Sequence, residues 1–457
     1  MPGTFPGSLI SRYILGRLGA VHHSELAAGA AAVLRGNDRG RMTAAAPRLY
    51  PHQWSWDAAF IAIGLAHLCV PRAITELTSL LAGQWSTGMI PHIVFGDASG
   101  YFPGPQRWRS QESPYAPRGV ATSGICQPPV HSLALAHLVA VARRNGQADR
   151  RTAEDFLAAS FDSWLAWHRW LATARDPGRA GLLEINHGWE SGMDNSPRWD
   201  APYARVHPGA MEPFERRDTA HVRDPSERPS DLDYRRYVWL VDQLAGVRYA
   251  DDAARGCDFR VADVFMSAVF AVSSEVLAEL ADDLGRDAAG TELRQLADRF
   301  RAGVSGTVDD GSGLARDRDV RTGEWLAGET VGGFAPLLCG ADDALVERQR
   351  ALLIGPRWCG YPRLRHALPP TTSPLAPEFH RRAYWRGPQW PVLTWLFCWA
   401  ASRRGDDELA GRFREEALHQ LDDGSFAEYY EPFTGEPLGS RAQSWTAAVT
   451  LAWLAER

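Results

Sequence analysis

The sequence predicts an all-α fold, because helical segments of two kinds alternate along its 457 residues and strand patterns are few and short. One kind is apolar on nearly every face, and the other is amphipathic with charged flanks. No sequence repeat of about 34 or 40 residues is visible, which disfavours an α-solenoid. Roughly twelve helices in buried-then-exposed pairs fit a closed double ring, the (α/α)6 barrel.

The apolar segments tend to precede the amphipathic ones, and a helix that is apolar on every side is buried on every side. We expect the apolar helices at residues 57–68, 128–142, 262–277, 388–401 and 443–454. The amphipathic helices, which should cover the first set and face water, lie at residues 23–35, 151–172, 286–300 and 406–421. The sequence therefore predicts an inner ring of buried helices inside an outer ring.

Two stretches interrupt the helical pattern, residues 83–129 and 184–237, both rich in Gly, Pro, Arg and aromatic residues. Long aperiodic segments in a compact domain are usually functional loops or lids. No linker divides the chain. We therefore expect one catalytic domain over residues 1–457, in which these two stretches form a cap over the mouth of the barrel.

Composition and charge exclude several classes of function. Lys plus Arg total 49 and Asp plus Glu total 55, a formal charge of −6, so there is no basic footprint for nucleic acid or for a membrane surface. The first residues lack a signal-peptide pattern and no apolar run approaches about 20 residues, so we expect a cytoplasmic protein without a membrane span. The 6 cysteines form no C-x-x-C pair and the histidines have no zincin spacing, so we expect no metal and no cofactor.

Polar and aromatic residues stand at the start of the apolar helices, in a chain that contains 18 tryptophans. If the inner helices run the same way, these starts meet at one mouth of the ring and surround one pocket. The residues expected around it are Trp54, Trp56, Asp57, Gln127, Trp385, Arg386, Gln389, Trp390 and Gln443. Sugar rings stack on indoles, although a large aromatic core would also use them, and Asp57 or Gln127 could simply cap a helix.

Two further segments supply carboxylates in aromatic surroundings. Residues 181–200 carry Glu184, Glu190, Asp194 and Asp200, and residues 426–439 carry Glu428, Glu431 and Glu436. Acids among Trp, Met, Phe and Tyr suit a raised proton affinity, which general acid catalysis requires. The alternative is that they cap helices or pair with Arg198 and Arg441. A pair of carboxylates in an aromatic pocket is typical of glycoside hydrolysis.

Four segments of the sequence resemble the inverting (α/α)6 glycosidases, which include trehalases, processing α-glucosidases and glycoside hydrolase family 63. ESGMDNSPRWD resembles their E-S-G-x-D segment, FAEYYEPFTGE their acid ahead of a Pro-x-Thr-Gly turn, and YWRGPQW their Y-W-R-G-P-x-W segment. WSWD before a buried helix also matches. Within that group, the short chain and the SGICQPP and HGWESGMDNSP segments are most similar to mannosylglycerate and glucosylglycerate hydrolases.

The resemblance implies an inverting reaction on a small α-glycoside, with Asp194 as general acid and Glu428 as general base. Inversion implies carboxyl groups roughly 6.5–9.5 Å apart, which leaves room for a water. Matched positions for the innermost sugar are Tyr50, Trp54, Trp56, Asp57, Gln127, Trp189, Gly192, Trp385, Trp390 and Gln443. Positions implied for the aglycone are Tyr101, Arg228, Tyr234 and Tyr384. The resemblance also implies a small-molecule sugar substrate as the partner and allows a homo-oligomer.

Alternative interpretations stay open at this point. A trehalase or another α-disaccharide glucosidase is the main one, and the sequence does not distinguish glucose from mannose. A sugar-binding protein derived from a glycosidase would lack a catalytic acid, whereas both are present, and an epimerase or lyase would be expected to use His or Tyr bases. Arg228 is expected to bind the carboxylate of glycerate; alternatively, the arginines of its loop pair with Asp218, Asp224 and Glu227 on the surface.

Overall fold

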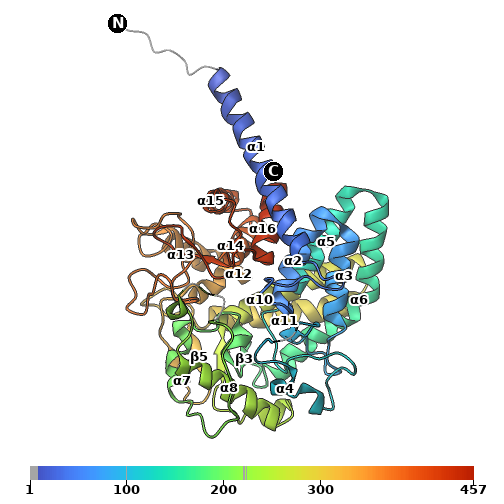
Figure 1. Ribbon diagram of the computed structural model, residues 1–457, viewed down its shortest axis with the longest axis vertical. Coiled ribbons are helices and arrows are strands. Elements are labelled where there is room, and N and C mark those ends of the chain that lie inside the picture. The colour runs from blue at the N-terminus through green and yellow to red at the C-terminus, as the bar shows by residue number, and fades with distance from the viewer. Residues whose placement is uncertain (1–8, 99, 220–221, 223, 457) are drawn as a thin grey trace.

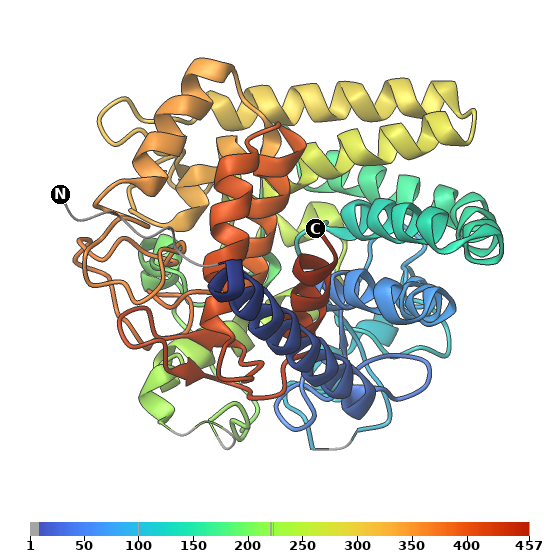
Figure 2. The same ribbon diagram turned by 90° about the horizontal axis from the view of Figure 1, so that it is seen from above.

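Helices arranged in two concentric rings make up most of the protein (Figures 1 and 2). The structure is a computed structural model that describes residues 9–98, 100–219, 222 and 224–456, with side chains from residue 23 onward. Figure 2 views the molecule from above. The helix pairs follow one another around the centre in chain order, from blue to red.

The inner ring closes on itself. It consists of α2 (Ser55–Leu68), α5 (His131–Asn145), α10 (Val264–Asp283), α12 (Ala335–Cys339), α14 (Pro391–Arg403) and α16 (Ser444–Ala455). Each of these helices packs on the next, and α16 packs on α2. The outer helices that cover them in the same order are α3 (Val70–Leu81), α6 (Gln147–Ala174), α11 (Asp287–Ser305), α13 (Asp343–Ile354), α15 (Asp407–Gln420) and α1 (Leu9–Asn37). The predicted (α/α)6 barrel is confirmed.

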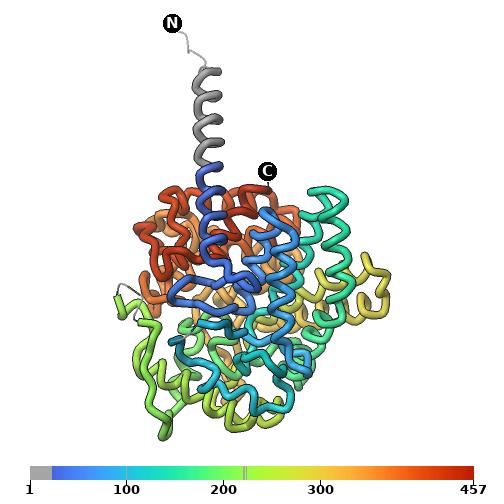
Figure 3. Tube along the Cα trace, turned by 45° about the vertical axis from the view of Figure 1, so that its right-hand side comes forward, coloured from blue at the N-terminus to red at the C-terminus, as the bar shows by residue number. Residues whose placement is uncertain are grey.

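Hydrophobic periodicity explains which ring a helix joins. All residues of α2 from Ser55 to Ala66 are buried, as expected for a helix that is apolar on every side. The outer helix α11 instead buries one stripe, at Leu293, Leu296, Ala297, Phe300 and Val304, which packs on α10. The described part of α1 runs beside α16, so the C-terminal end of the barrel wall lies against it (Figure 3).

Some elements were absent from the predicted set. Helices α3, α12 and α13 fall between the expected segments, and α12 has only five residues, too few to show a helical period. Helix α10 is the one described helix long and apolar enough to cross a membrane, but 89% of its most apolar stretch is buried inside the protein. Its length and apolar character are therefore those of a buried core helix of the barrel.

Short strands and short helices gather at one end of the barrel, away from the labelled termini, and form the cap (Figure 1). A four-stranded antiparallel sheet joins β3 (Leu183–Ile185), β4 (Val261–Asp263), β5 (Asp317–Asp319) and β6 (Trp325–Leu326), with Leu183 opposite Asp263. Two further strand pairs join β1 (Gln53–Trp54) to β2 (Ile93–Val94) and β7 (Tyr429–Tyr430) to β8 (Pro437–Leu438).

The two aperiodic stretches supply much of this cap. They contain α4 (Pro105–Trp108), α7 (Asp200–Ala204) and the single 3-10 turns Ser110–Glu112, Gly188–Ser191, Pro197–Trp199 and Pro225–Glu227. The second stretch ends inside α8 (Asp231–Gly246), which the sequence analysis had placed partly in a loop, and α9 (Asp251–Ala254) follows. A further 3-10 turn, Val331–Phe334, leads into α12. The cap residues stand over the starts of α2 and α16, where the site lies.

Candidate active site

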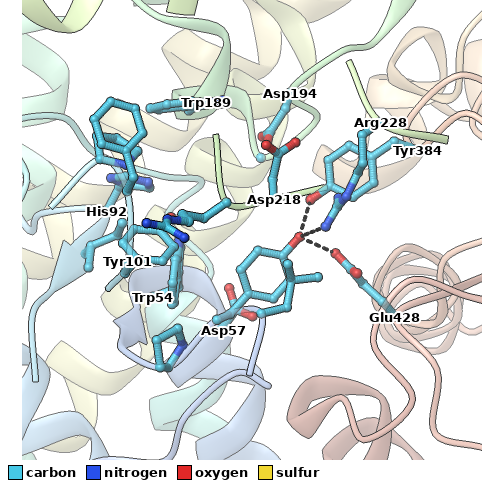
Figure 4. Close-up of a pocket in the computed structure, with 18 of the residues that line it drawn as sticks. Trp54, Asp57, His92, Tyr101, Trp189, Asp194, Asp218, Arg228, Tyr384 and Glu428 are labelled. Atoms are coloured by element: carbon cyan, nitrogen blue, oxygen red, sulfur yellow. Dashed lines mark hydrogen bonds between the residues drawn. The ribbon is translucent and has the colours of Figure 1, made fainter. Parts of the chain in front are cut away.

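A cavity of about 300 Å³ lies between the cap and the starts of the inner helices (Figure 4). The predicted site residues that line it are Tyr50, Trp54, Trp56, Asp57, Tyr101, Gln127, Trp189, Gly192, Asp194, Arg228, Tyr234, Tyr384, Trp385, Glu428 and Gln443. They come from segments that are far apart in the chain. The structure thus brings these residues together in one place, and their individual roles remain predictions.

Three expected pocket residues do not line the cavity. Trp390 is fully buried and stacks behind Trp385, with ring centroids 3.5 Å apart and planes 7° apart, so it supports that ring instead of presenting its own face. Arg386 forms a two-point ion pair with Asp200 at 2.7 and 2.8 Å. The side-chain amide of Gln389 is buried and donates to backbone carbonyls in the 366–368 segment. All three residues therefore act in support of the fold.

Ion pairing separates the candidate carboxylates into two groups. The partners of the paired acids are Arg260 for Glu184, Arg175 for Glu190, Arg386 for Asp200, Arg381 for Glu431 and Arg382 for Glu436. These five acids therefore form ion pairs, as the alternative interpretation expected, but their partners are not Arg198 and Arg441. Asp194 and Glu428 form no ion pair among the described residues, and both line the cavity, where they lie on opposite sides (Figure 4).

Asp194 has the proton affinity of a general acid. Burial raises the pKa of its carboxyl group to about 7, the positive charge of Arg228 opposes that shift, and the negative charge of Glu428 adds to it. A group with such a pKa carries a proton for much of the time at neutral pH. The turn before it needs glycine at position 192, where φ is +71° and an added Cβ would lie 2.7 Å from the Trp56 ring.

Glu428 is held by two donors. The Tyr50 hydroxyl donates to its Oε1 at 2.8 Å, and the backbone N–H of Ser440 donates to its Oε2 at 3.2 Å. The chain is also tight around this carboxylate, because a Cβ at Gly439 would lie 2.3 Å from Oε2. Its orientation is therefore fixed from both sides.

Arg228 is a buried cation without a carboxylate partner among the described residues. Its side chain is only 6% exposed, its Nη2 donates to the Tyr50 hydroxyl at 2.7 Å, and its guanidinium lies 4.3 Å from the centre of the Tyr384 ring. The nearby acids are occupied elsewhere: Asp218 binds Arg216, Glu227 binds Arg382 and Asp224 binds Ser226. A buried charge without a counter-ion is costly, so this site favours an anionic ligand.

The inner part of the cavity combines aromatic rings with a few polar groups. Trp54 and Tyr101 meet edge to face at 5.4 Å, and Gln127 Oε1 accepts from the free backbone N–H of Trp56 in the first turn of α2 at 3.2 Å. Burial raises the pKa of Asp57, and Glu428 and Asp194 raise it further. Aromatic faces flanked by hydroxyl, amide and carboxyl groups suit a sugar ring.

The sequence analysis missed several residues that line the cavity. They are Arg48, His92, Arg217, Asp218, Tyr237 and Trp445. Trp445 lies at the start of the apolar helix expected at residues 443–454, two positions after Gln443, so its position could have been inferred. Asp218 lies in an aperiodic loop where no spacing indicates which side chains turn inward. No group of three or more His, Cys, Asp or Glu residues arranged for a metal occurs in the described part of the chain.

Comparison with known proteins gives a consistent result. Residues 50–446 match the family model "Mannosylglycerate hydrolase MGH1-like glycoside hydrolase domain". A glucosylglycerate hydrolase from Mycolicibacterium hassiacum is 54% identical over 438 residues, which covers 94% of this chain and 98% of that protein. A mannosylglycerate hydrolase from Thermus thermophilus is 38% identical over 424 residues, covering 92% of this chain and 98% of that protein.

Solved structures agree with these sequence matches. The crystal structure of a GH63 mannosylglycerate hydrolase from Thermus thermophilus, in complex with Tris and D-glycerate, aligns with a TM-score of 0.85 at 38% identity. The alignment covers 94% of this chain and 99% of the crystal chain. A neutral trehalase from Saccharomyces cerevisiae aligns with a TM-score of 0.50 at 16% identity over 88% of this chain and 72% of that chain, a likeness of fold alone.

Proposed function

The chain belongs to the family of mannosylglycerate hydrolase MGH1-like glycoside hydrolases, and on that basis we propose that it hydrolyses glucosylglycerate or mannosylglycerate with inversion at the anomeric carbon. Glucosylglycerate is the preferred substrate in this proposal, because the hydrolase of that name is 54% identical and the Thermus mannosylglycerate hydrolase 38%. The observation that carries it is the pair Asp194 and Glu428, without ion-pair partners among the described residues, on opposite sides of a cavity that also holds the cation Arg228.

In the proposed reaction the two carboxylates have separate tasks. Asp194 gives its proton to the glycosidic oxygen while the bond between that oxygen and the anomeric carbon breaks, so glycerate leaves as an alcohol. Glu428 takes a proton from a water molecule, whose oxygen forms the new bond to the anomeric carbon from the opposite face. The environments support this division, since burial raises the pKa of Asp194 to about 7 whereas Tyr50 and Ser440 donate hydrogen bonds to Glu428.

The aglycone is the second part of the proposal. Arg228 would pair with the glycerate carboxylate, in a wall that also contains the hydroxyls of Tyr101, Tyr234 and Tyr384. The protein has a formal charge of −6, so its overall field does not attract the glycerate anion, and a local cation has to bind it. An uncharged disaccharide such as trehalose would leave Arg228 buried without a counter-ion, which argues against the trehalase alternative.

A substrate panel tests the proposal. Glucosylglycerate, mannosylglycerate, trehalose and kojibiose are each incubated with the enzyme, released hexose is measured, and the anomer formed first is followed by proton NMR. We expect hydrolysis of a glycerate glycoside with the β-anomer released first from the α-glycoside. Release of the α-anomer would mean retention, and cleavage of trehalose alone would favour the other glucosidase class.

A further inference from the structure

Asp218 brings a further carboxylate to the cavity, from the cap segment between α7 and α8. Arg216 holds it at two points, with Nε 3.0 Å from Oδ1 and Nη2 2.7 Å from Oδ2. Arg216 is itself fixed, because its Nη1 binds Asp231 at 2.8 Å and its guanidinium lies 4.5 Å from the centre of the Tyr234 ring. The position of the Asp218 carboxylate is thus set by an arginine that is itself held in place.

This carboxylate is unexpected in a site for an anion, because its charge opposes the charge of the substrate. It lines the cavity together with Tyr101 and Arg228, and its negative charge contributes to the raised pKa values of Asp194 and Tyr101. Arg216 offsets the negative charge of Asp218 but occupies only part of the hydrogen-bonding capacity of its carboxylate. Each carboxylate oxygen accepts two hydrogen bonds, so among the described residues one acceptor position on each oxygen stays free after Arg216 has bound.

The ligand itself offers a matching donor. Glycerate has a carboxylate and two hydroxyls, and the glycosidic bond uses one hydroxyl, which leaves the other free. Arg228 stands ten positions after Asp218 in the same cap segment, so the acceptor and the cation come from one stretch of chain. Asp57 and Glu428 come instead from the barrel side, and Asp194 is assigned to the glycosidic oxygen.

Resting on the proposed function, we propose that Asp218 determines aglycone specificity by accepting a hydrogen bond from the free hydroxyl of glycerate while Arg228 pairs with its carboxylate. Together with the glycosidic bond, these contacts fix three groups around the stereocentre of the aglycone. Three fixed groups define the handedness of a ligand, whereas a carboxylate contact alone does not. The enzyme would thereby separate glycerate glycosides from those of lactate, an acid of the same charge without the second hydroxyl.

The test compares α-glucosylglycerate with α-glucosyl-lactate on the wild-type enzyme and on Asp218→Ala and Asp218→Asn. A hydrogen bond to a charged group corresponds to about 10- to 150-fold in kcat/KM. We expect the wild type to prefer the glycerate glycoside by such a factor. In Asp218→Ala the preference should fall to within a few-fold of unity, with the loss on the glycerate glycoside, and Asp218→Asn should fall between the two.

A matched control comes from the same segment. Glu215→Gln removes a charge three positions away that pairs with Arg217, and it leaves both carboxylate partners of Arg216 in place. It should keep the wild-type preference. Equal losses on both substrates in Asp218→Ala, or equal gains through relief of repulsion, would overturn the inference while the proposed function stands. A wild-type enzyme that cleaves neither glycerate glycoside would overturn the proposed function and this inference with it.

Discussion

The hydroxyl of Tyr50 has one proton and three polar neighbours, and this sets the direction of the hydrogen bonds around Glu428. Its proton goes to the carboxylate at 2.8 Å, so its oxygen accepts from Arg228 at 2.7 Å. The Tyr384 hydroxyl, 3.0 Å away, must then donate as well. Positive charge at Arg228 is in this way connected to negative charge at Glu428 through a single phenol, without a direct ion pair (Figure 4).

The residue scale also gives a pH prediction. Asp194 must be protonated to act as the proposed acid, and burial raises its pKa to about 7, so kcat/KM should fall as the pH rises through about 7. Arg228 lowers that pKa, so Arg228→Gln should move the alkaline limb to higher pH and also raise KM for glycerate glycosides. The measurement is kcat/KM from pH 5 to 9 for both enzymes, with an uncharged α-glucoside as the control for KM. An unmoved limb would contradict the assignment of Asp194 as the acid.

Single residues were predictable from sequence where a motif names them, but the face that each side chain presents was not. Trp385 and Trp390 occur in one segment, yet one lines the cavity and the other stacks behind it, a difference that depends on packing against Tyr429 and Trp445. Asp218 had no motif at all. Its position depends on Arg216 and Tyr234, and such contacts have no spacing that a sequence pattern could show.

At the scale of elements, the long apolar and amphipathic helices were predicted to within six residues, because periodicity is strong over ten or more positions. The exception is α1, which begins at Leu9, 14 residues before the expected start. The start of α8 could have been found too. Ser230 accepts from the backbone N–H of Asp233, the S-x-x-D pattern of a helix start, which the loop assignment overlooked. The strands β3 to β6 have two or three residues each, too few for an alternating pattern, and their pairing joins segments far apart in the chain.

The turn between β8 and α16 yields a prediction at this scale. Gly439 has φ +66°, and an added Cβ would lie 2.3 Å from Glu428 Oε2. Gly439→Ala should displace Glu428, the proposed base, and lower kcat by at least about 10-fold, while the αL conformation costs about 1–2 kcal/mol of stability. Gly424→Ala is the matched control, since Gly424 has φ +70° and nothing within 4 Å of the added Cβ. It should lose similar stability, measured as Tm, and keep kcat; equal kcat in both variants would refute the displacement.

For the whole molecule, buried histidines predict how stability depends on pH. Burial lowers the pKa of His52, His67, His92, His131, His137, His168 and His187 from the ordinary value near 6.5. Several of them join helices of the barrel: His131 in α5 binds Ser55 in α2, and His168 in α6 binds Ser132 and Ser274. Their neutral form is therefore part of the folded structure.

The sign of the effect follows from proton uptake. Below about pH 6.5 the histidines of the unfolded chain bind protons, whereas the same histidines stay neutral in the folded protein. Folding stability therefore falls as the pH decreases toward about 4. Buried carboxyl groups oppose this trend, because burial raises their pKa values in the folded state. The large upward shifts are at Asp57, Asp194, Glu76 and Asp317, the last three to about 7, 6 and 6, and the smaller ones are at Asp176, Asp242, Asp251 and Glu456. Four large shifts at carboxyl groups stand against seven at histidines, so the histidines dominate. Thermal unfolding between pH 4 and 8 should show Tm nearly constant above pH 7 and falling below pH 6.5. A Tm that rises on acidification would contradict the prediction.

The closed ring has a consequence for folding of the chain during its synthesis on the ribosome. The contact between α2 and α16 joins the first and last inner helices, and the hydrogen bond from Tyr50 to Glu428 spans 378 residues. At about 5–20 residues per second, synthesis takes roughly 20 to 75 s to cover that interval. During this time α2, apolar on every side, exists without the neighbour that completes its burial. The barrel wall cannot cover its earliest inner helix until translation reaches its last, so we expect the nascent chain to expose an apolar helix to chaperones over that interval.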